Sequence, residues 1–323
     1  MTPRTRWYLT LGAFLVVIGA LVGTLCYRSF AIWLAPQKRA IAARSAAAVA
    51  ADSIFWNTFH GAHYDQLPAT IEVLTRAYLA TPNDPVTAAH LGWLHMWRIS
   101  ERTRLDSIPA TIADEILLAR RYFEESVQLD HSDARTLGFL ASATLAEGNI
   151  QGDDRLVRKG YFILRDAINA WPAFNLFTAG YVLSSLPSQS KQFDEGVAWQ
   201  WRNLDVCAGQ RVDREHPSFT RHMAKITDDR ACLNTVIAPH NFEGFFLNMG
   251  DMLTKKGDWQ LAQEIYANAK LSPDFGTWKF VSVLEERIRS AQTNVARFNK
   301  VDPDPKTGLM IGSAFSCMAC HQL

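Results

Sequence analysis

Helical periodicity interrupted by short breakers is the feature that most constrains the fold of this chain. From about residue 52 to residue 299, nearly every segment has apolar residues at helical spacing. No run of alternating β-branched residues bounded by turns is present, so a β-sheet is not expected. The breakers are TPNDP at 81–85, LDHSDA at 129–134, EGNIQGDD at 147–154, SLPSQS at 185–190, KKGDW at 255–259 and LSPDF at 271–275. The sequence therefore predicts an all-α fold.

The segments between these breakers have the features of an internal repeat, and the clearest copy runs from Phe245 to Phe275. It has a glycine where two helices would cross, a glycine in the turn, and small and aromatic residues alternating on the second helix. These positions are filled by Phe246, Gly250, Gly257, Ala262, Tyr266 and Ala269. The pattern resembles a tetratricopeptide (TPR) unit. The resemblance implies antiparallel helix pairs stacked into an α-solenoid over residues 52–299. A generic helical bundle is the alternative.

Weaker copies of the pattern lie upstream. The residues that carry them are Leu91, Gly92, Ala119, Phe123, Ser126, Leu137, Leu140, Ala141, Gly148, Gly160, Ala167 and Pro172. The stretch from Pro187 to Ala238 fits the pattern poorly, and longer, irregular helices are expected there.

The N-terminal segment Trp7–Tyr27 contains no charged residue and is long enough to span a bilayer as a helix. We expect an uncleaved transmembrane signal anchor here, preceded by a cytoplasmic tail at 1–6. Residues 28–51 are rich in alanine and are expected to continue it as a helical stalk. Gly19 and Gly23 form a G-x-x-x-G pattern, which could pack two such helices into a homodimer.

The cysteines indicate the compartment. Basic residues flank the apolar segment on both sides, so their charge does not fix its orientation. Cys207 and Cys232 lie twenty-five positions apart and could close a disulfide, or they could be two buried thiols. Stable disulfides belong to oxidising or exported compartments. We therefore expect a single-pass protein of a bacterial inner membrane, with its body in the periplasm.

Residues 300–323 form a tail that carries the sequence C-x-x-C-H, which is the attachment signature of a c-type haem. Cys317 and Cys320 would form the thioether bonds of one covalent haem c, and His321 would be the axial ligand of the iron. The alternatives are a plain disulfide, an exposed dithiol and half of a zinc site. No second pair of zinc ligands is evident, since His60 and His63 are expected to be surface residues.

The second axial ligand is open at this stage. Met310 lies seven residues before Cys317 and is one candidate. His240, Met249 and Met252 in the repeat body are others, as are a side chain of another protein and an open site. The tail is too short to cover the apolar surface of a haem, so the repeat body, the membrane side or a partner must do so.

The formal net charge of +1 gives no indication of a nucleic-acid partner, and no catalytic or phosphate-binding motif is visible. We therefore expect a non-enzymatic, membrane-anchored monohaem protein in electron transfer or redox sensing. Its repeat surface would dock a redox or assembly partner. The alternative function is a scaffold or assembly factor, for example in respiratory-complex or cytochrome maturation, whose terminal cysteines are disulfide-bonded.

Overall fold

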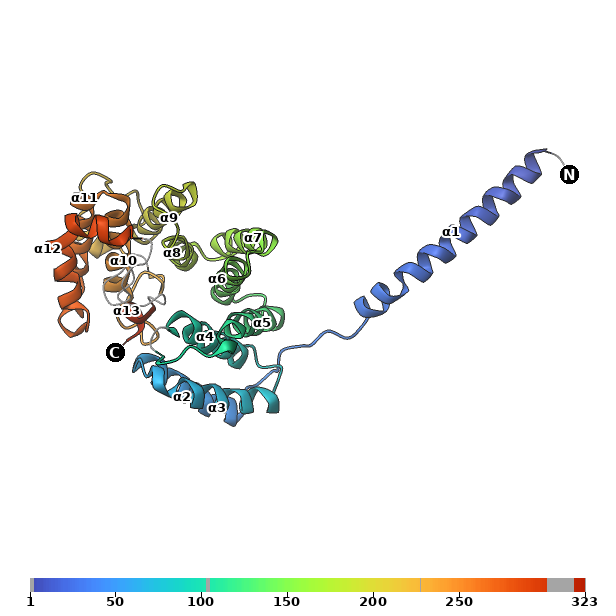
Figure 1. Cartoon of the computed structure of the whole chain (residues 1–323), viewed down its shortest axis with the longest axis horizontal. Coiled ribbons are helices and arrows are strands. Elements are labelled where there is room, and N and C mark those ends of the chain that lie inside the picture. The colour runs from blue at the N-terminus through green and yellow to red at the C-terminus, as the bar shows by residue number, and fades with distance from the viewer. Residues whose placement is uncertain (1–2, 103–104, 227, 301–316, 323) are drawn as a thin grey trace. The chain divides into compact units, whose positions relative to one another are not determined.

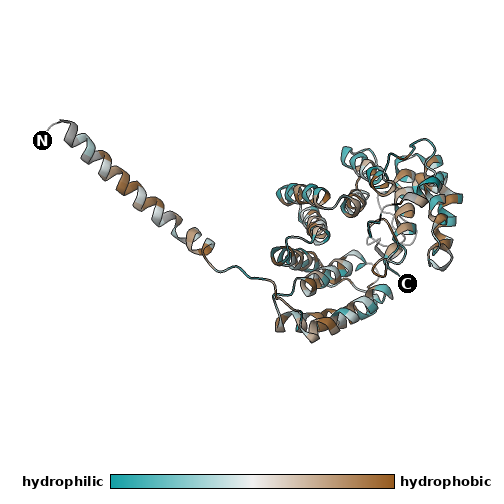
Figure 2. Ribbon diagram, turned by 180° about the vertical axis from the view of Figure 1, so that it is seen from behind, coloured by the Kyte–Doolittle hydropathy of each residue, from teal (hydrophilic) through white to brown (hydrophobic). Residues whose placement is uncertain are grey.

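The computed structural model describes residues 3–102, 105–226, 228–300 and 317–322. The chain forms two compact units, Met1–Arg39 and Ala40–Leu323 (Figure 1). All regular secondary structure in the described residues is helical, which confirms the predicted all-α fold. Figure 2 shows that the helices of the second unit carry both hydrophobic and hydrophilic residues, as expected for helices packed on one face.

The first unit consists mainly of helix α1 (Pro3–Trp33), which covers the apolar N-terminal segment. Among the described residues, no helix combines the length and the apolarity that crossing a membrane requires. The expectation of a continuous helical stalk over residues 28–51 is wrong, because residues 34–45 lie outside any helix. Pro36 accounts for the break, since the residue before a proline is pushed away from the helical conformation.

The second unit begins with a short extended segment that is held against the first helices. Ser45 caps helix α2 (Ala46–His60), its hydroxyl accepting a hydrogen bond from the backbone N–H of Ala48 at 3.2 Å. Arg44 forms ion pairs with Asp52 of α2 and with Asp84. The alanine-rich residues 46–51 are therefore part of the folded body.

Helices α2 to α9 follow as consecutive pairs, α10 and α11 form a further pair, and α12 packs on that pair (Figure 1). The remaining bounds are α3 (Leu67–Ala80), α4 (Pro85–Ser100), α5 (Asp114–Leu129), α6 (Ala134–Gln151), α7 (Asp154–Ala170), α8 (Pro172–Leu183), α9 (Lys191–Ala208), α10 (Asn241–Lys256), α11 (Trp259–Ala267), α12 (Val281–Phe298) and α13 (Cys317–His321). Five of the six predicted breakers lie at or next to these helix ends, and LSPDF at 271–275 lies between the short 3-10 helices Asn268–Leu271 and Phe275–Thr277. For example, α5 ends and α6 begins within LDHSDA at 129–134.

Glycines allow the paired helices to approach closely. Gly92 of α4 lies under the ring of Phe123 of α5, so a Cβ on this glycine would be 2.7 Å from ring carbons. Gly250 of α10 lies in the same way against Tyr266 of α11, whose side chain is fully buried. Gly257 ends α10 with a φ of +107°, a conformation that favours glycine. The close helix crossings therefore use glycine and aromatic positions that the sequence analysis singled out.

The stretch that fits the repeat poorly is partly regular helix and partly loop. Helix α9 is regular and ends at Gly209, whose φ is +64°. Between residues 209 and 240, the regular structure among the described residues is one short 3-10 helix, η4 (Thr220–Lys225). The expectation of longer, irregular helices in the stretch from Pro187 to Ala238 is therefore wrong. Side chains satisfy backbone groups of this loop that have no partner in a helix. For example, the side-chain oxygen of Asn268 accepts a hydrogen bond from the backbone N–H of Phe219 at 2.7 Å. Cys207 and Cys232 form a disulfide that ties the loop to α9, with their Cα atoms 5.5 Å apart.

Candidate functional site

Helix α13, which carries the C-x-x-C-H motif, is docked against α10 and also contacts α2 (Figure 1). Trp278 donates a hydrogen bond from its indole N–H to the carbonyl of Ala319 at 2.8 Å. The backbone N–H of His240 donates to the carbonyl of Cys320 at 3.0 Å. Ala319 and Cys320 are buried. Residues 319–321 therefore have a defined position against α10.

The imidazole of His321 is oriented by one backbone carbonyl. Its Nδ1–H donates to the carbonyl oxygen of Ile237 at 2.6 Å, which leaves Nε2 as the nitrogen available to a ligand. The ring lies 5.2 Å from the ring of Phe59, measured between centroids. Burial lowers the pKa of His321 to about 4, against the opposing effect of the Ile237 hydrogen bond, so the imidazole is neutral at pH 7.

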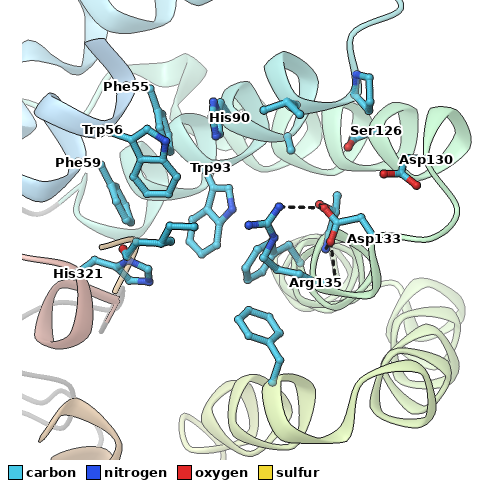
Figure 3. Close-up of a pocket in the computed structure, with 17 residues that line it drawn as sticks. Phe55, Trp56, Phe59, His90, Trp93, Ser126, Asp130, Asp133, Arg135 and His321 are labelled. Atoms are coloured by element: carbon cyan, nitrogen blue, oxygen red, sulfur yellow. Dashed lines mark hydrogen bonds and ion pairs between the residues drawn. The ribbon is translucent and has the colours of Figure 1, made fainter. Parts of the chain in front are cut away.

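His321 lies at one end of a partly open pocket with a cavity volume of about 80 Å³ (Figure 3). The pocket follows the first helices of successive pairs, α2, α4, α6 and α8, together with Ile237 of the disulfide-bonded loop. Its aromatic lining consists of Phe55, Trp56, Phe59, Trp93, Phe139 and Phe174. This volume lies below the range of small-molecule and cofactor sites, about 300–1,000 Å³.

His60 lies beside His321, so the expectation that it is a surface residue is wrong. It is partly buried at the C-terminal end of α2, and its Nε2–H donates to the same Ile237 carbonyl at 3.0 Å. The ring centroids of His60 and His321 are 6.4 Å apart, and the ring planes differ by 13°. Burial lowers the pKa of His60. His63 is exposed, as expected.

The wall of the pocket away from His321 is polar. His90 stacks on Phe55 with a centroid distance of 4.0 Å and donates from Nδ1 to Asp52 at 2.9 Å. Burial acts to raise the pKa of Asp52, but hydrogen bonds from His90 and Arg44 outweigh it and hold this pKa at about 2. Arg135 also lines the pocket, where it pairs with Asp133 at 3.0 Å (Figure 3).

The other candidate iron ligands lie away from this pocket or outside the described residues. Met249 and Met252 are each 1% exposed and belong to the hydrophobic core around α10. His240 is buried, with its Nδ1 3.3 Å from a carboxylate oxygen of Glu243. Met310 lies outside the described residues. Among the described residues, no group of three or more His, Cys, Asp or Glu side chains could hold a metal ion, so the zinc alternative gains no support there.

Two features of the residues around His321 suit a haem, but the pocket as it stands is too small to hold one. The aromatic walls suit a flat apolar group, and the hydrogen bond from Nδ1 to a carbonyl is typical of a metal-bound histidine. Cys320 does not fit either, because its sulfur lies against Gly244 of α10 and does not line the pocket. This sulfur would have to turn away from Gly244 to bond to a haem vinyl group.

No protein-family model matches this chain, and no curated protein or solved structure matches it.

Proposed function

We propose that this chain is a monohaem c-type protein that acts in electron transfer or redox sensing. Cys317 and Cys320 would hold the haem through thioether bonds, and His321 would bind its iron through Nε2. The aromatic residues of the pocket would contact the porphyrin, for which the pocket would have to widen. The haem supplies a reversible one-electron change at iron.

The observation that carries this proposal is the position of His321. Its Nδ1–H is held by the Ile237 carbonyl at 2.6 Å, and its ring lies at the end of an aromatic-lined pocket. A backbone acceptor of this kind fixes the tautomer and increases the basicity of the ligating nitrogen. The aromatic residues beside His321 support the proposal that the helices would cover part of a haem.

The proposed location is the periplasmic side of a bacterial inner membrane, with α1 as the anchor that the sequence predicts. The disulfide between Cys207 and Cys232 supports an oxidising compartment. A periplasmic location is tested by protease protection in spheroplasts, where the body should be degraded without lysis. Degradation that occurs only after lysis contradicts this orientation.

The haem itself is tested on the full-length chain produced in cells that mature c-type cytochromes. We expect a pyridine haemochrome spectrum of a thioether-bonded haem and a haem-sized mass increment on the C-terminal peptide. Both should be lost in a Cys317→Ala, Cys320→Ala double variant. A wild-type chain without haem would contradict the proposal and leave the scaffold function, in which the helix pairs dock an assembly partner.

A further inference from the structure

We propose that helix α13 is a latch that controls the reactivity of the C-x-x-C-H motif. In the docked position α13 shields the sulfur of Cys320, and local release of α13 from α10 exposes it. The shielding does not depend on a bound cofactor. The role of the latch in haem attachment rests on the proposed function, because the pocket beside His321 is too small for a haem while α13 is docked.

The docked position encloses Cys320. This residue is 3% exposed, and its sulfur lies against the backbone of Gly244 on α10. The preceding residue, Ala319, is 1% exposed and belongs to the hydrophobic core around α10. A reagent has to reach the sulfur before the thiol can react with it. Docking of α13 therefore keeps reagents away from Cys320.

Hydrogen bonds from the body hold the last turn of α13. The final carbonyl groups of a helix have no partner within the helix. Here the indole N–H of Trp278 donates to the carbonyl of Ala319 at 2.8 Å, and the backbone N–H of His240 donates to the carbonyl of Cys320 at 3.0 Å. A third bond runs from His321 to a carbonyl of the disulfide-bonded loop at 2.6 Å. Release of α13 requires that these three bonds break.

Release of α13 does not require the body to unfold. The helix has five residues, and a helix of this length is not stable by itself in water. It follows the last helix pair in the sequence, and α10 and α11 pack directly on each other. Segments near chain ends open locally at a lower free-energy cost than global unfolding. We therefore expect α13 to leave α10 while the helix pairs stay folded.

The test measures the alkylation of Cys320 by iodoacetamide in the full-length, haem-free chain. A Cys317→Ser background prevents a disulfide within the motif, and mass spectrometry of the C-terminal peptide gives the rate. We expect alkylation on the order of 100-fold slower in the folded chain than in urea-unfolded chain, because three hydrogen bonds must break first. Since release exposes little surface, the rate should change little with urea below the unfolding transition.

Two variants should open the latch. Gly244→Ala, whose Cβ would overlap the sulfur of Cys320, should raise the alkylation rate about tenfold. Trp278→Phe removes the indole donor and should raise the rate about fivefold. The matched control is Gly276→Ala, where a Cβ would meet nothing within 4 Å and the rate should stay at the starting value. The urea midpoint of each variant distinguishes release of α13 from a destabilised body.

Three results would overturn the latch. The first is alkylation of the folded chain at the unfolded rate. The second is a rate that rises with urea as steeply as global unfolding does, and the third is an equal rate with and without Gly244→Ala. None of them concerns haem. A wild type without covalent haem overturns the proposed function instead, and it leaves the shielding of Cys320 as measured.

Discussion

The sulfur of Cys320 lies directly over the backbone of Gly244. It occupies the space that the Cβ of any other residue at position 244 would fill. A Cβ on Gly244 would overlap this sulfur and would lie 3.2 Å from the backbone nitrogen of Cys320. Helix α13 can pack against α10 because α10 has no side chain at position 244. The same contact keeps the sulfur away from the pocket that His321 lines.

Gly244→Ala should weaken the docking of α13 in the haem-free chain. Overpacking of this kind costs about 1–3 kcal/mol, and here it can be relieved by release of the short helix. We expect faster hydrogen exchange in residues 317–322, measured by mass spectrometry. The control is Gly276→Ala, where a Cβ would meet nothing within 4 Å. Unchanged exchange in Gly244→Ala would show that the contact does not hold the tail.

Gly250→Ala should destabilise the whole second unit by about 1–3 kcal/mol, because its Cβ would overlap the ring of Tyr266. Tyr266 cannot move easily, since its hydroxyl donates a hydrogen bond to the buried carboxylate of Asp251 on α10 at 2.6 Å. The measurement is the urea midpoint followed by far-UV circular dichroism. A midpoint equal to that of the wild type would contradict the close helix crossing.

Loss of the disulfide between Cys207 and Cys232 should lower the free energy of unfolding by about 3–4 kcal/mol, from the entropy of the loop it closes. Reductant should lower the urea midpoint of the wild type. It should not lower that of the Cys207→Ala, Cys232→Ala variant, which is already destabilised. Because Ile237 lies in the same loop, we also expect reduction to speed hydrogen exchange in α13. A wild-type urea midpoint that does not change with reductant would contradict the stabilising role of the disulfide.

Asp52 should make the protein sensitive to acid. Its folded-state pKa of about 2 lies below the ordinary 3.8, so its stabilising effect is present above pH 3.8 and is lost as pH falls towards 2. Because the carboxylate is only partly buried, solvent screening reduces the effect to about 1 kcal/mol. Asp52→Asn should be less stable at pH 6 and should lose less stability between pH 4 and pH 2. Parallel stability curves for the two proteins would contradict the ion-pair network.

The helix ends were predictable because local residues determine them. Asp133 accepts from the N–H groups of Arg135 and Thr136 at the start of α6, and Gly257 ends α10 by its backbone conformation. Both signals lie within a few residues of the boundary. Pro36 is an equally local signal, and it outweighs the helix propensity of the alanines that follow it.

The candidate site was only partly predictable. The C-x-x-C-H spacing identified His321, but the contact between His321 and Ile237 joins residues 84 positions apart and has no signature in the sequence. The signal that points to His60 is the aromatic run of Phe55, Trp56 and Phe59 just before it, which marks α2 as a helix with an aromatic inner face. Periodicity alone does not show what packs opposite such a face.

The double hydrogen bond at Ile237 has a consequence for the order in which the site is assembled. The carbonyl joins His60, 177 residues earlier, to His321, 84 residues later. The helix pairs leave the ribosome first and can fold during synthesis. The pocket residues and His60 can therefore fold before residues 317–322 are translated, and His321 then binds to a surface that has already formed.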